Sequence, residues 1–236
     1  MLMQDATIPV LTIDGPAGSG KGTVSQRIAQ SLRWHLLDSG ALYRLVGLLA
    51  RQQAVAMHNE AAVADLARHL PVRFVLDPNG QGVQALLDGE VVDNRLRTEQ
   101  AGHDASVVAA IPAVREALLQ RQRDFAVAPG LVADGRDMGT VVFPNALLKV
   151  FLTASVEERA QRRYKQLQEQ QLSVNLDEIQ QEIALRDQRD AERSTAPLRP
   201  AEDAWVLDTT SLPIDAVVVQ VLGRLRTCLT QAELVQ

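Results

Sequence analysis

A glycine-rich segment with one lysine stands near the start of the chain, directly after a short apolar run. Residues 15–23 are Gly-Pro-Ala-Gly-Ser-Gly-Lys-Gly-Thr, and the run before them ends at Ile13. Glycines let the backbone curl around a phosphate without side-chain clashes, so that successive N–H groups can point inward. A helix that followed would add its unpaired N–H groups and the positive end of its dipole. The segment therefore predicts a site for the phosphates of a nucleoside triphosphate.

The spacing from Gly15 to Gly20 and Lys21 fits the P-loop pattern, with one departure. The residue after the lysine is Gly22, and the hydroxyl comes one place later, at Thr23. This departure from the usual pattern indicates that the chain belongs to a particular class of nucleoside-triphosphate-binding proteins.

Two other structures could carry such glycines, a plain turn between a strand and a helix or a dinucleotide-binding turn. The second also expects an acid about 20 residues further on, and Asp38 is near that place. However, a lysine inside the loop does not suit dinucleotide binding, and the helix that follows is amphipathic. Both features favour the phosphate loop.

The apolar pattern predicts the elements that hold this loop. We expect strands at 8–13, 34–37, 130–134, 147–152 and 205–207. We expect helices at 20–33, 41–54, 60–69, 98–110, 112–128, 155–170, 176–193 and 214–229. Apolar strands that alternate with helices predict an α/β fold with a parallel sheet covered on both faces.

A different pattern interrupts this alternation. Short β runs at 72–76, 83–87 and 90–92 are separated by the turn-forming residues 77–82 and by Asp88-Gly89. We expect a small antiparallel meander inserted in the α/β chain.

Charged residues follow the expected strand 130–134. Asp134 stands at its carboxyl end, where open α/β sheets place ligand groups, and could hold magnesium or its waters; alternatively, it is a turn aspartate before Gly135. Arg136 could bind an acceptor phosphate. Asp137 could accept a hydrogen bond from an exocyclic amine such as cytosine N4.

Two expected helices carry arginines, namely Arg159, Arg162 and Arg163 on the first and Arg186, Arg189 and Arg193 on the second, with Asp190. Steps of three and four residues place those of the second helix on one side. This could be a solvated face with salt bridges, for example from Glu182 to Arg186. Beside a phosphate loop, the two helices joined by residues 169–173 could instead form a closing lid whose arginines stabilise a transferring phosphoryl group.

Composition excludes several classes. The chain has 236 residues, of which 46% are hydrophobic, which suits a core with insertions. The net charge of −5 disfavours general nucleic-acid binding, although arginines outnumber lysines. One cysteine, Cys228, excludes an intrachain disulfide, and the four histidines have no metal-ligand spacing. With no long apolar run and no basic start, we expect a soluble, cytoplasmic protein without a membrane partner.

Five segments together resemble the bacterial cytidylate kinases of the long, single-chain type, and the resemblance extends over essentially the whole chain. The segments are 13–23, 34–44, 111–119, 133–144 and 186–190. The Lys-Gly-Thr form of the loop is similar to that of the nucleoside monophosphate kinases, which accounts for Gly22.

The resemblance implies transfer of the γ-phosphoryl group of ATP to CMP or dCMP with Mg²⁺, by a P-loop core with a five-stranded parallel sheet. It also implies a division into the core at 1–58, 111–154 and 194–236, a monophosphate-binding lobe at 59–110 and a lid at 155–193. We expect a monomer with these small-molecule substrates.

The resemblance further implies a role for particular residues. The ATP site would consist of Gly15, Pro16, Ala17, Gly18, Ser19, Gly20, Lys21, Gly22, Thr23 and Arg162. The acceptor site would consist of Ser39, Arg44, Ser106, Arg115, Arg136, Asp137, Arg186, Asp190 and Arg193. Lys21, Arg136 and Arg193 would assist transfer, and Thr23 and Asp134 would hold magnesium, Asp134 through water.

Two rival functions remain at this stage. One is a P-loop kinase for another monophosphate or small acceptor. The other is a nucleotide-dependent switch that binds ATP without consuming it.

Overall fold

The computed structural model describes residues 8–76, 83–96, 98–169, 174–193 and 195–235. The chain divides into two compact units: unit 1, Met1–His35 with Val127–Gln236, and unit 2, Leu36–Ala126. The turn expected at 77–82 lies outside the described residues, as do residues 170–173 of the helix connection expected at 169–173.

The main sheet has five strands in the order β2-β6-β1-β7-β8. Its strands are β1 (Val10–Asp14), β2 (His35–Asp38), β6 (Leu131–Gly135), β7 (Leu148–Thr153) and β8 (Trp205–Asp208). The central strand β1 is buried along its whole length and pairs in parallel with β6 and β7. The five-stranded parallel α/β sheet predicted from the sequence is confirmed.

The register of the sheet brings two acids to one edge. Ile13 of β1 lies opposite Asp134 of β6, and Asp14 lies opposite Gly135. Because the carboxyl ends of parallel strands meet at the same edge, the residues that follow β1 and β6 share that edge.

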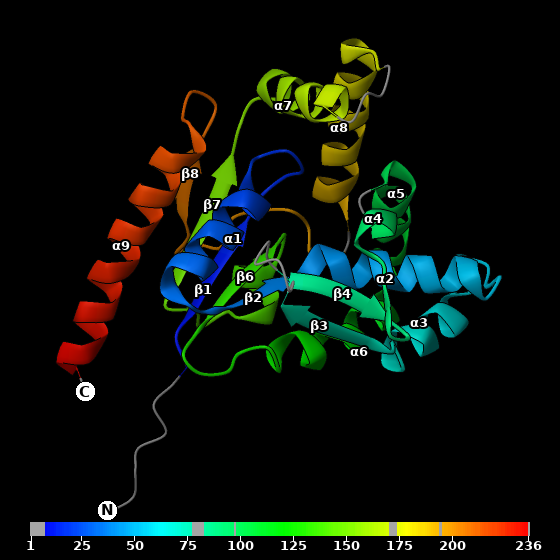
Figure 1. Ribbon diagram of the computed structural model, residues 1–236, viewed down its shortest axis with the longest axis horizontal. Coiled ribbons are helices and arrows are strands. Elements are labelled where there is room, and N and C mark those ends of the chain that lie inside the picture. The colour runs from blue at the N-terminus through cyan, green and yellow to red at the C-terminus, as the bar shows by residue number, and fades with distance from the viewer. Residues whose placement is uncertain (1–7, 77–82, 97, 170–173, 194, 236) are drawn as a thin grey trace, which may run out of the picture. The chain divides into compact units, whose positions relative to one another are not determined.

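Helices complete unit 1. They are α1 (Lys21–Leu32), η1 (Met138–Val142), α7 (Val156–Glu169), α8 (Leu176–Glu192) and α9 (Ile214–Val235). The red helix α9 in Figure 1 packs against α1 and β7. It buries Val217, Val221 and Leu225, which recur every four residues and so form one apolar stripe.

Helices α7 and α8 pack against each other over a small core of their own (Figure 1). Ala160 and Leu167 of α7 meet Ile179 and Ile183 of α8. The two charged helices expected from the sequence are therefore present, and their apolar positions hold them together.

The described residues of unit 2 form five helices and the smaller sheet. The helices are α2 (Ser39–Gln52), α3 (Glu60–Arg68), α4 (Asp93–Leu96), α5 (Glu99–Val108) and α6 (Pro112–Arg123). Strands β3 (Val72–Leu76), β4 (Val83–Leu87) and β5 (Glu90–Val91) pair antiparallel in that order. The predicted meander is confirmed.

A buried acid joins two helices of unit 2. Asp104 of α5 is 3% exposed and accepts hydrogen bonds from Nε and Nη2 of Arg51 on α2, the latter at 2.8 Å. Burial pushes the pKa of Asp104 upward, but hydrogen bonds from Arg51 and Gln100 outweigh it and leave the pKa below its ordinary value. The pair stabilises the packing of α2 on α5.

Some boundaries differ from the sequence-based expectation. The short helices η1 and α4 are not among the expected elements. Helix α6 ends at Arg123 rather than near 128, and α9 continues to Val235. Such differences arise where tertiary packing, rather than local pattern, decides where a helix ends.

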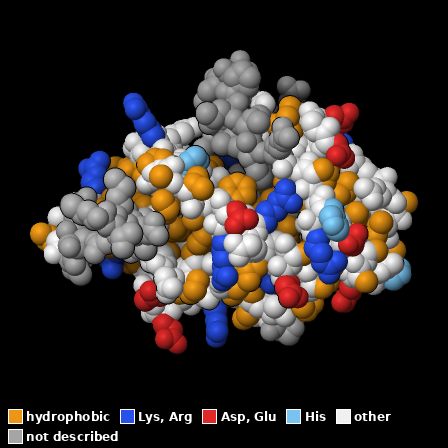
Figure 2. Space-filling view, turned by 90° about the horizontal axis from the view of Figure 1, so that it is seen from below, with side chains coloured by type: hydrophobic (Ala, Val, Ile, Leu, Met, Phe, Trp, Pro, Cys, Tyr) orange, Lys and Arg blue, Asp and Glu red, His pale blue; other side chains and the backbone are white. Residues whose placement is uncertain are grey.

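Figure 2 shows basic and acidic side chains interspersed over the face in view. Within the described part of the chain, no helix combines the length and apolar character needed to cross a bilayer.

Candidate active site

The glycine-rich loop lies tightly against the end of β7. Gly15 has a φ of 151°, and a Cβ there would stand 2.1 Å from the carbonyl oxygen of Leu152. Gly20 has a φ of 88° and precedes the first residue of α1, Lys21. Only glycine fits the first position and is comfortable at the second, so the sequence fixes the curled path of the loop.

A buried hydroxyl closes the loop from within. Ser19 is 1% exposed, and its Oγ donates to the carbonyl oxygen of Pro16 at 3.0 Å. On the outside, Arg162 of α7 donates from Nη1 to the carbonyl oxygen of Ser19 at 3.4 Å. Arg162, expected at the ATP site, therefore touches the loop.

Lys21 and Asp134 meet beside the loop. Lys21 Nζ lies 3.9 Å from Asp134 Oδ1, and the side chain of Asp134 is 8% exposed. A Cβ on Gly22 would stand 3.3 Å from Asp134 Oδ2, so glycine at this position leaves room for the carboxylate. The departure from the usual P-loop pattern thus has a local steric reason.

The oxygens at this place fit a magnesium ion. Mg²⁺ prefers hard oxygen ligands and is bound by one or two carboxylates together with water and substrate phosphates. Asp134 supplies a carboxylate at the sheet edge, and Thr23 is exposed in the first turn of α1. The donor set therefore suits magnesium held mainly by phosphates and water.

Asp14 organises the segment after β6. Its Oδ1 accepts the backbone N–H of Met138 and its Oδ2 that of Gly139, both at 2.8 Å. These N–H groups begin the π-helix η1, and the preceding Asp137 makes no side-chain cap bond. Asp14 therefore supplies the cap, and Asp137 is not needed for it.

Burial raises the pKa of Asp14 to about 7. The two backbone N–H bonds oppose this shift, and the nearby charges of Asp137 and Asp134 add to it. Three acids therefore lie close together at the edge where β1 and β6 end.

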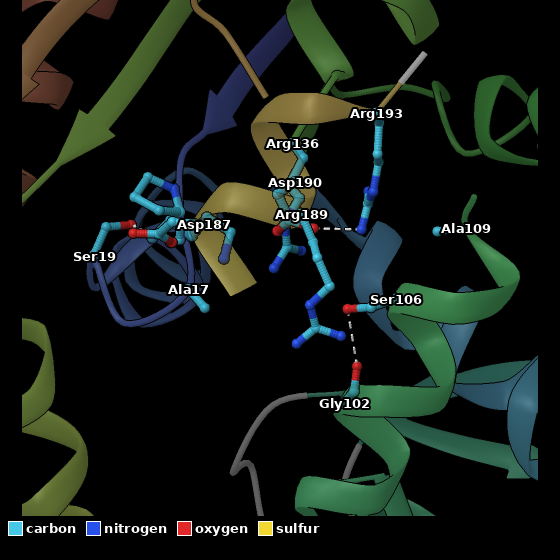
Figure 3. A network of polar contacts seen from close by, with 12 residues as sticks. Ala17, Ser19, Gly102, Ser106, Ala109, Arg136, Asp187, Arg189, Asp190 and Arg193 are labelled. Carbon is cyan, nitrogen blue, oxygen red and sulfur yellow. Dashed lines mark hydrogen bonds and ion pairs between the residues drawn. The ribbon is translucent and has the colours of Figure 1, made fainter. Parts of the chain in front are cut away.

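Asp190 brings two of the expected arginines together (Figure 3). Arg136 Nε donates to Asp190 Oδ2, and Arg193 Nη2 donates to Asp190 Oδ1. The carboxylate is 1% exposed, and the backbone oxygen of Asp190 accepts the N–H of Leu198 at 2.9 Å. The end of β6 and the last turn of α8 are thus joined by a buried charge cluster.

The structure brings together the following predicted residues in unit 1: the loop 15–23 with Arg162, Lys21 with Asp134, and Arg136 with Asp190 and Arg193. Arg186 lies half-buried on α8, one turn before Asp190.

Four predicted acceptor residues belong to unit 2. Ser39 is buried at the start of α2, which also carries Arg44. Ser106 of α5 donates to the carbonyl oxygen of Gly102 at 3.2 Å. Arg115 of α6 lies over the ring of Tyr43, 5.8 Å from its centroid. Arg115 is thus held beside α2.

Sequence reasoning missed the roles of three polar residues in unit 1. Asp14 caps η1, Thr209 approaches the loop with its hydroxyl, and Arg159 is buried rather than exposed on a mobile helix. An acid at the end of the first strand was the available signal for Asp14. The other two depend on contacts that are distant in the sequence.

The parallel sheet, the glycine loop and the lysine with its facing carboxylate define a P-loop nucleotide-binding α/β protein. The model of the cytidylate kinase family matches residues 11–227. The chain belongs to that family.

Curated relatives agree over nearly the whole chain. A cytidylate kinase of Pseudomonas putida is 56% identical over 227 residues, which are 96% of this chain and 98% of the relative. One of Shewanella denitrificans is 53% identical over 222 residues, which are 94% and 98%. One of Pseudomonas fluorescens is 56% identical over 217 residues, which are 92% and 95%.

Proposed function

We propose that this chain catalyses the ATP-dependent phosphorylation of CMP and dCMP to CDP and dCDP. The observation that carries the proposal is the phosphate loop with Lys21 facing Asp134, in a chain of the cytidylate kinase family. The geometry suits transfer by positioning and charge stabilisation, without a covalent intermediate.

On the donor side, residues 15–23 bind the phosphates of ATP through backbone N–H groups, and Arg162 borders them. Lys21 neutralises charge on the outer phosphates. Asp134, through water, and Thr23 would hold Mg²⁺, which would supply charge neutralisation at the phosphates. Asp134 also holds the ammonium group of Lys21 beside the phosphate loop.

On the acceptor side, Asp137 accepts a hydrogen bond from the exocyclic amine of cytosine, with Ser106 and Arg115 as further base contacts. Arg186 and Asp190 contact the sugar. Ser39, Arg44, Arg136 and Arg193 bind phosphate groups. In this assignment, residues 59–110 form the monophosphate lobe and 155–193 the lid, in a cytoplasmic monomer.

The donor site can be tested at Lys21. Lys21→Ala removes the charge while the loop keeps its backbone, so we expect phosphoryl transfer to fall by about a thousandfold with the circular dichroism spectrum unchanged. Lys165→Ala, at an exposed position on α7, is the control and should leave turnover unchanged. Turnover near the parental value in Lys21→Ala would show that Lys21 takes no part in phosphoryl transfer.

The metal can be tested separately. Chelation with EDTA should abolish turnover and added Mg²⁺ should restore it, whereas undiminished turnover in EDTA would contradict the metal assignment. A protein that binds ATP but never forms ADP in the presence of CMP and Mg²⁺ would be a switch rather than a kinase.

A further inference from the structure

Side chains from outside the phosphate loop hold two of its carbonyl groups. Arg159 of α7 donates from Nη1 to the carbonyl oxygen of Ala17 at 3.1 Å. The hydroxyl of Thr209, just after β8, lies 3.2 Å from the carbonyl oxygen of Ser19 and 3.0 Å from that of Thr153, so its one proton is shared between the two carbonyls. The same hydroxyl accepts a hydrogen bond from Nη1 of Arg162 at 3.2 Å. The contacts of Arg159 and Thr209 with the loop are made to its backbone, so they act on the path of the loop rather than on any side chain.

Because of peptide geometry, these contacts also fix the direction of the neighbouring N–H groups. A trans peptide is planar, and its C=O and N–H point in opposite directions. The peptides that join Ala17 to Gly18 and Ser19 to Gly20 are trans. Holding their carbonyls outward therefore aims the N–H groups of Gly18 and Gly20 to the opposite side. Alternating inward N–H groups are what a phosphate cradle requires.

All three guanidinium nitrogens of Arg159 donate hydrogen bonds within the protein. Arg159 is 3% exposed, and its Nε donates to the carbonyl oxygen of Ala154 at 3.0 Å. Nη1 also donates to Asp187 Oδ1 at 3.0 Å, and Nη2 donates to Asp187 Oδ2. A guanidinium with every nitrogen so engaged is not a ligand for phosphate. Its fork instead links the end of β7, the loop and α8.

The close packing at Gly18 supports the same role. A Cβ on Gly18 would stand 3.0 Å from the Cβ of Arg159, so the loop passes directly over the base of this side chain. A buried ion pair can serve the fold alone. The contact to Ala17, however, is one that a purely structural pair would not need.

We propose that Arg159, together with Thr209, is a positioning residue of the donor site that fixes the peptide orientations of the phosphate loop. The proposal rests on the proposed ATP site at residues 15–23. Neither residue needs to touch ATP. Each residue acts through the backbone of the phosphate loop, which is the part that would contact ATP.

Steady-state kinetics of the full-length protein with ATP and CMP test this role in Arg159→Met and Arg159→Lys. Methionine keeps much of the volume but none of the donors, so we expect the KM for ATP to rise about tenfold and the KM for CMP to change less than about threefold. Lysine keeps one positively charged donor nitrogen in place of three, so its KM for ATP should fall between parent and Arg159→Met. A KM for ATP within about threefold of the parent in Arg159→Met would overturn the proposal.

The control is Arg51→Met, which removes another two-bond arginine–aspartate pair, in unit 2. It should lower the melting temperature and leave the KM for ATP unchanged. If Arg159→Met does not fold, Thr209→Val decides. This near-isosteric change removes only the hydroxyl, and its KM for ATP should also rise more than about threefold, a smaller change overturning the proposal.

The test separates this inference from the donor site itself. Loss of transfer in Lys21→Ala with an unchanged KM for ATP in the Arg159 and Thr209 variants refutes only the positioning role. Retained transfer in Lys21→Ala refutes the site on which the role depends.

Discussion

Arg136 and Asp190 are 54 residues apart in the sequence, yet Arg136 Nε donates directly to Asp190 Oδ2. The arginine follows β6, and the aspartate lies in the last turn of α8. Since Asp190 is 1% exposed, this pair has little screening by water. The other carboxylate oxygen binds Arg193, so one buried acid fixes two arginines of the proposed acceptor site.

Asp190→Asn tests the importance of this cluster. Removal of the charge leaves two arginines without their carboxylate, so we expect kcat/KM for CMP to fall about a hundredfold. The free energy of unfolding should fall by roughly 3 kcal/mol. Steady-state kinetics and urea unfolding measure the two effects.

Glu192→Gln is the matched control, because Glu192 is exposed on the same helix and its Oε1 accepts a hydrogen bond from the exposed side chain of Gln188 at 2.9 Å. It should leave both quantities unchanged. Parental kcat/KM for CMP in Asp190→Asn would show that the arginines do not depend on this acid.

Asp137 is expected to discriminate the acceptor base. Asp137→Ala removes an acceptor for the cytosine amine, so the KM for CMP should rise about tenfold or more. The Kd for ATP, measured by calorimetry, should stay within about twofold. An equal loss of affinity for CMP and ATP would mean that Asp137 supports the whole site rather than the base.

Asp14 should make stability depend on pH. Burial raises the pKa of Asp14 from its ordinary value of 3.8 to about 7 in the folded protein. Between these values the folded state holds the proton more tightly than the unfolded state, so the contribution of Asp14 to stability is fully present below about pH 4 and is lost as pH rises to about 7.

Urea unfolding of the nucleotide-free protein and of Asp14→Asn between pH 5 and pH 8 measures this contribution. Relative to the variant, the parent should lose up to about 1.4 kcal/mol per pH unit until about pH 7 and nothing beyond. A stability difference that is independent of pH would contradict the raised pKa.

The close approach of the loop to β7 can be separated from the cost of a positive φ. Gly15→Ala places a Cβ 2.1 Å from a backbone oxygen, whereas at Gly89, with a φ of 85°, nothing lies within 4 Å of the added atom. Gly89→Ala should therefore cost only about 1–2 kcal/mol of unfolding free energy. Gly15→Ala should cost more than that and also weaken ATP binding. Equal costs by thermal unfolding would mean that the loop can move away from β7.

Local patterns were enough to predict much of this protein. The apolar runs and turns predict β1, the glycine loop and the meander, because each depends on neighbouring residues. The contact of Asp14 with Gly139 depends instead on the register of β1 against β6, which no short pattern encodes.

The position of Arg159 also could not be predicted from local sequence patterns. On a charged helix it is indistinguishable by pattern from Arg163, yet it is buried and bonded to Asp187 and to the loop. Whether an arginine faces solvent, substrate or backbone is decided by packing between segments far apart in the chain.

The acceptor specificity tests the proposed function most directly. Initial rates with ATP and Mg²⁺ should be compared for CMP, dCMP, UMP, AMP and GMP at equal concentrations. We predict that kcat/KM for CMP and dCMP exceeds that for each of the other three by at least about tenfold. A kcat/KM for UMP or AMP equal to or above that for CMP would contradict the proposed function.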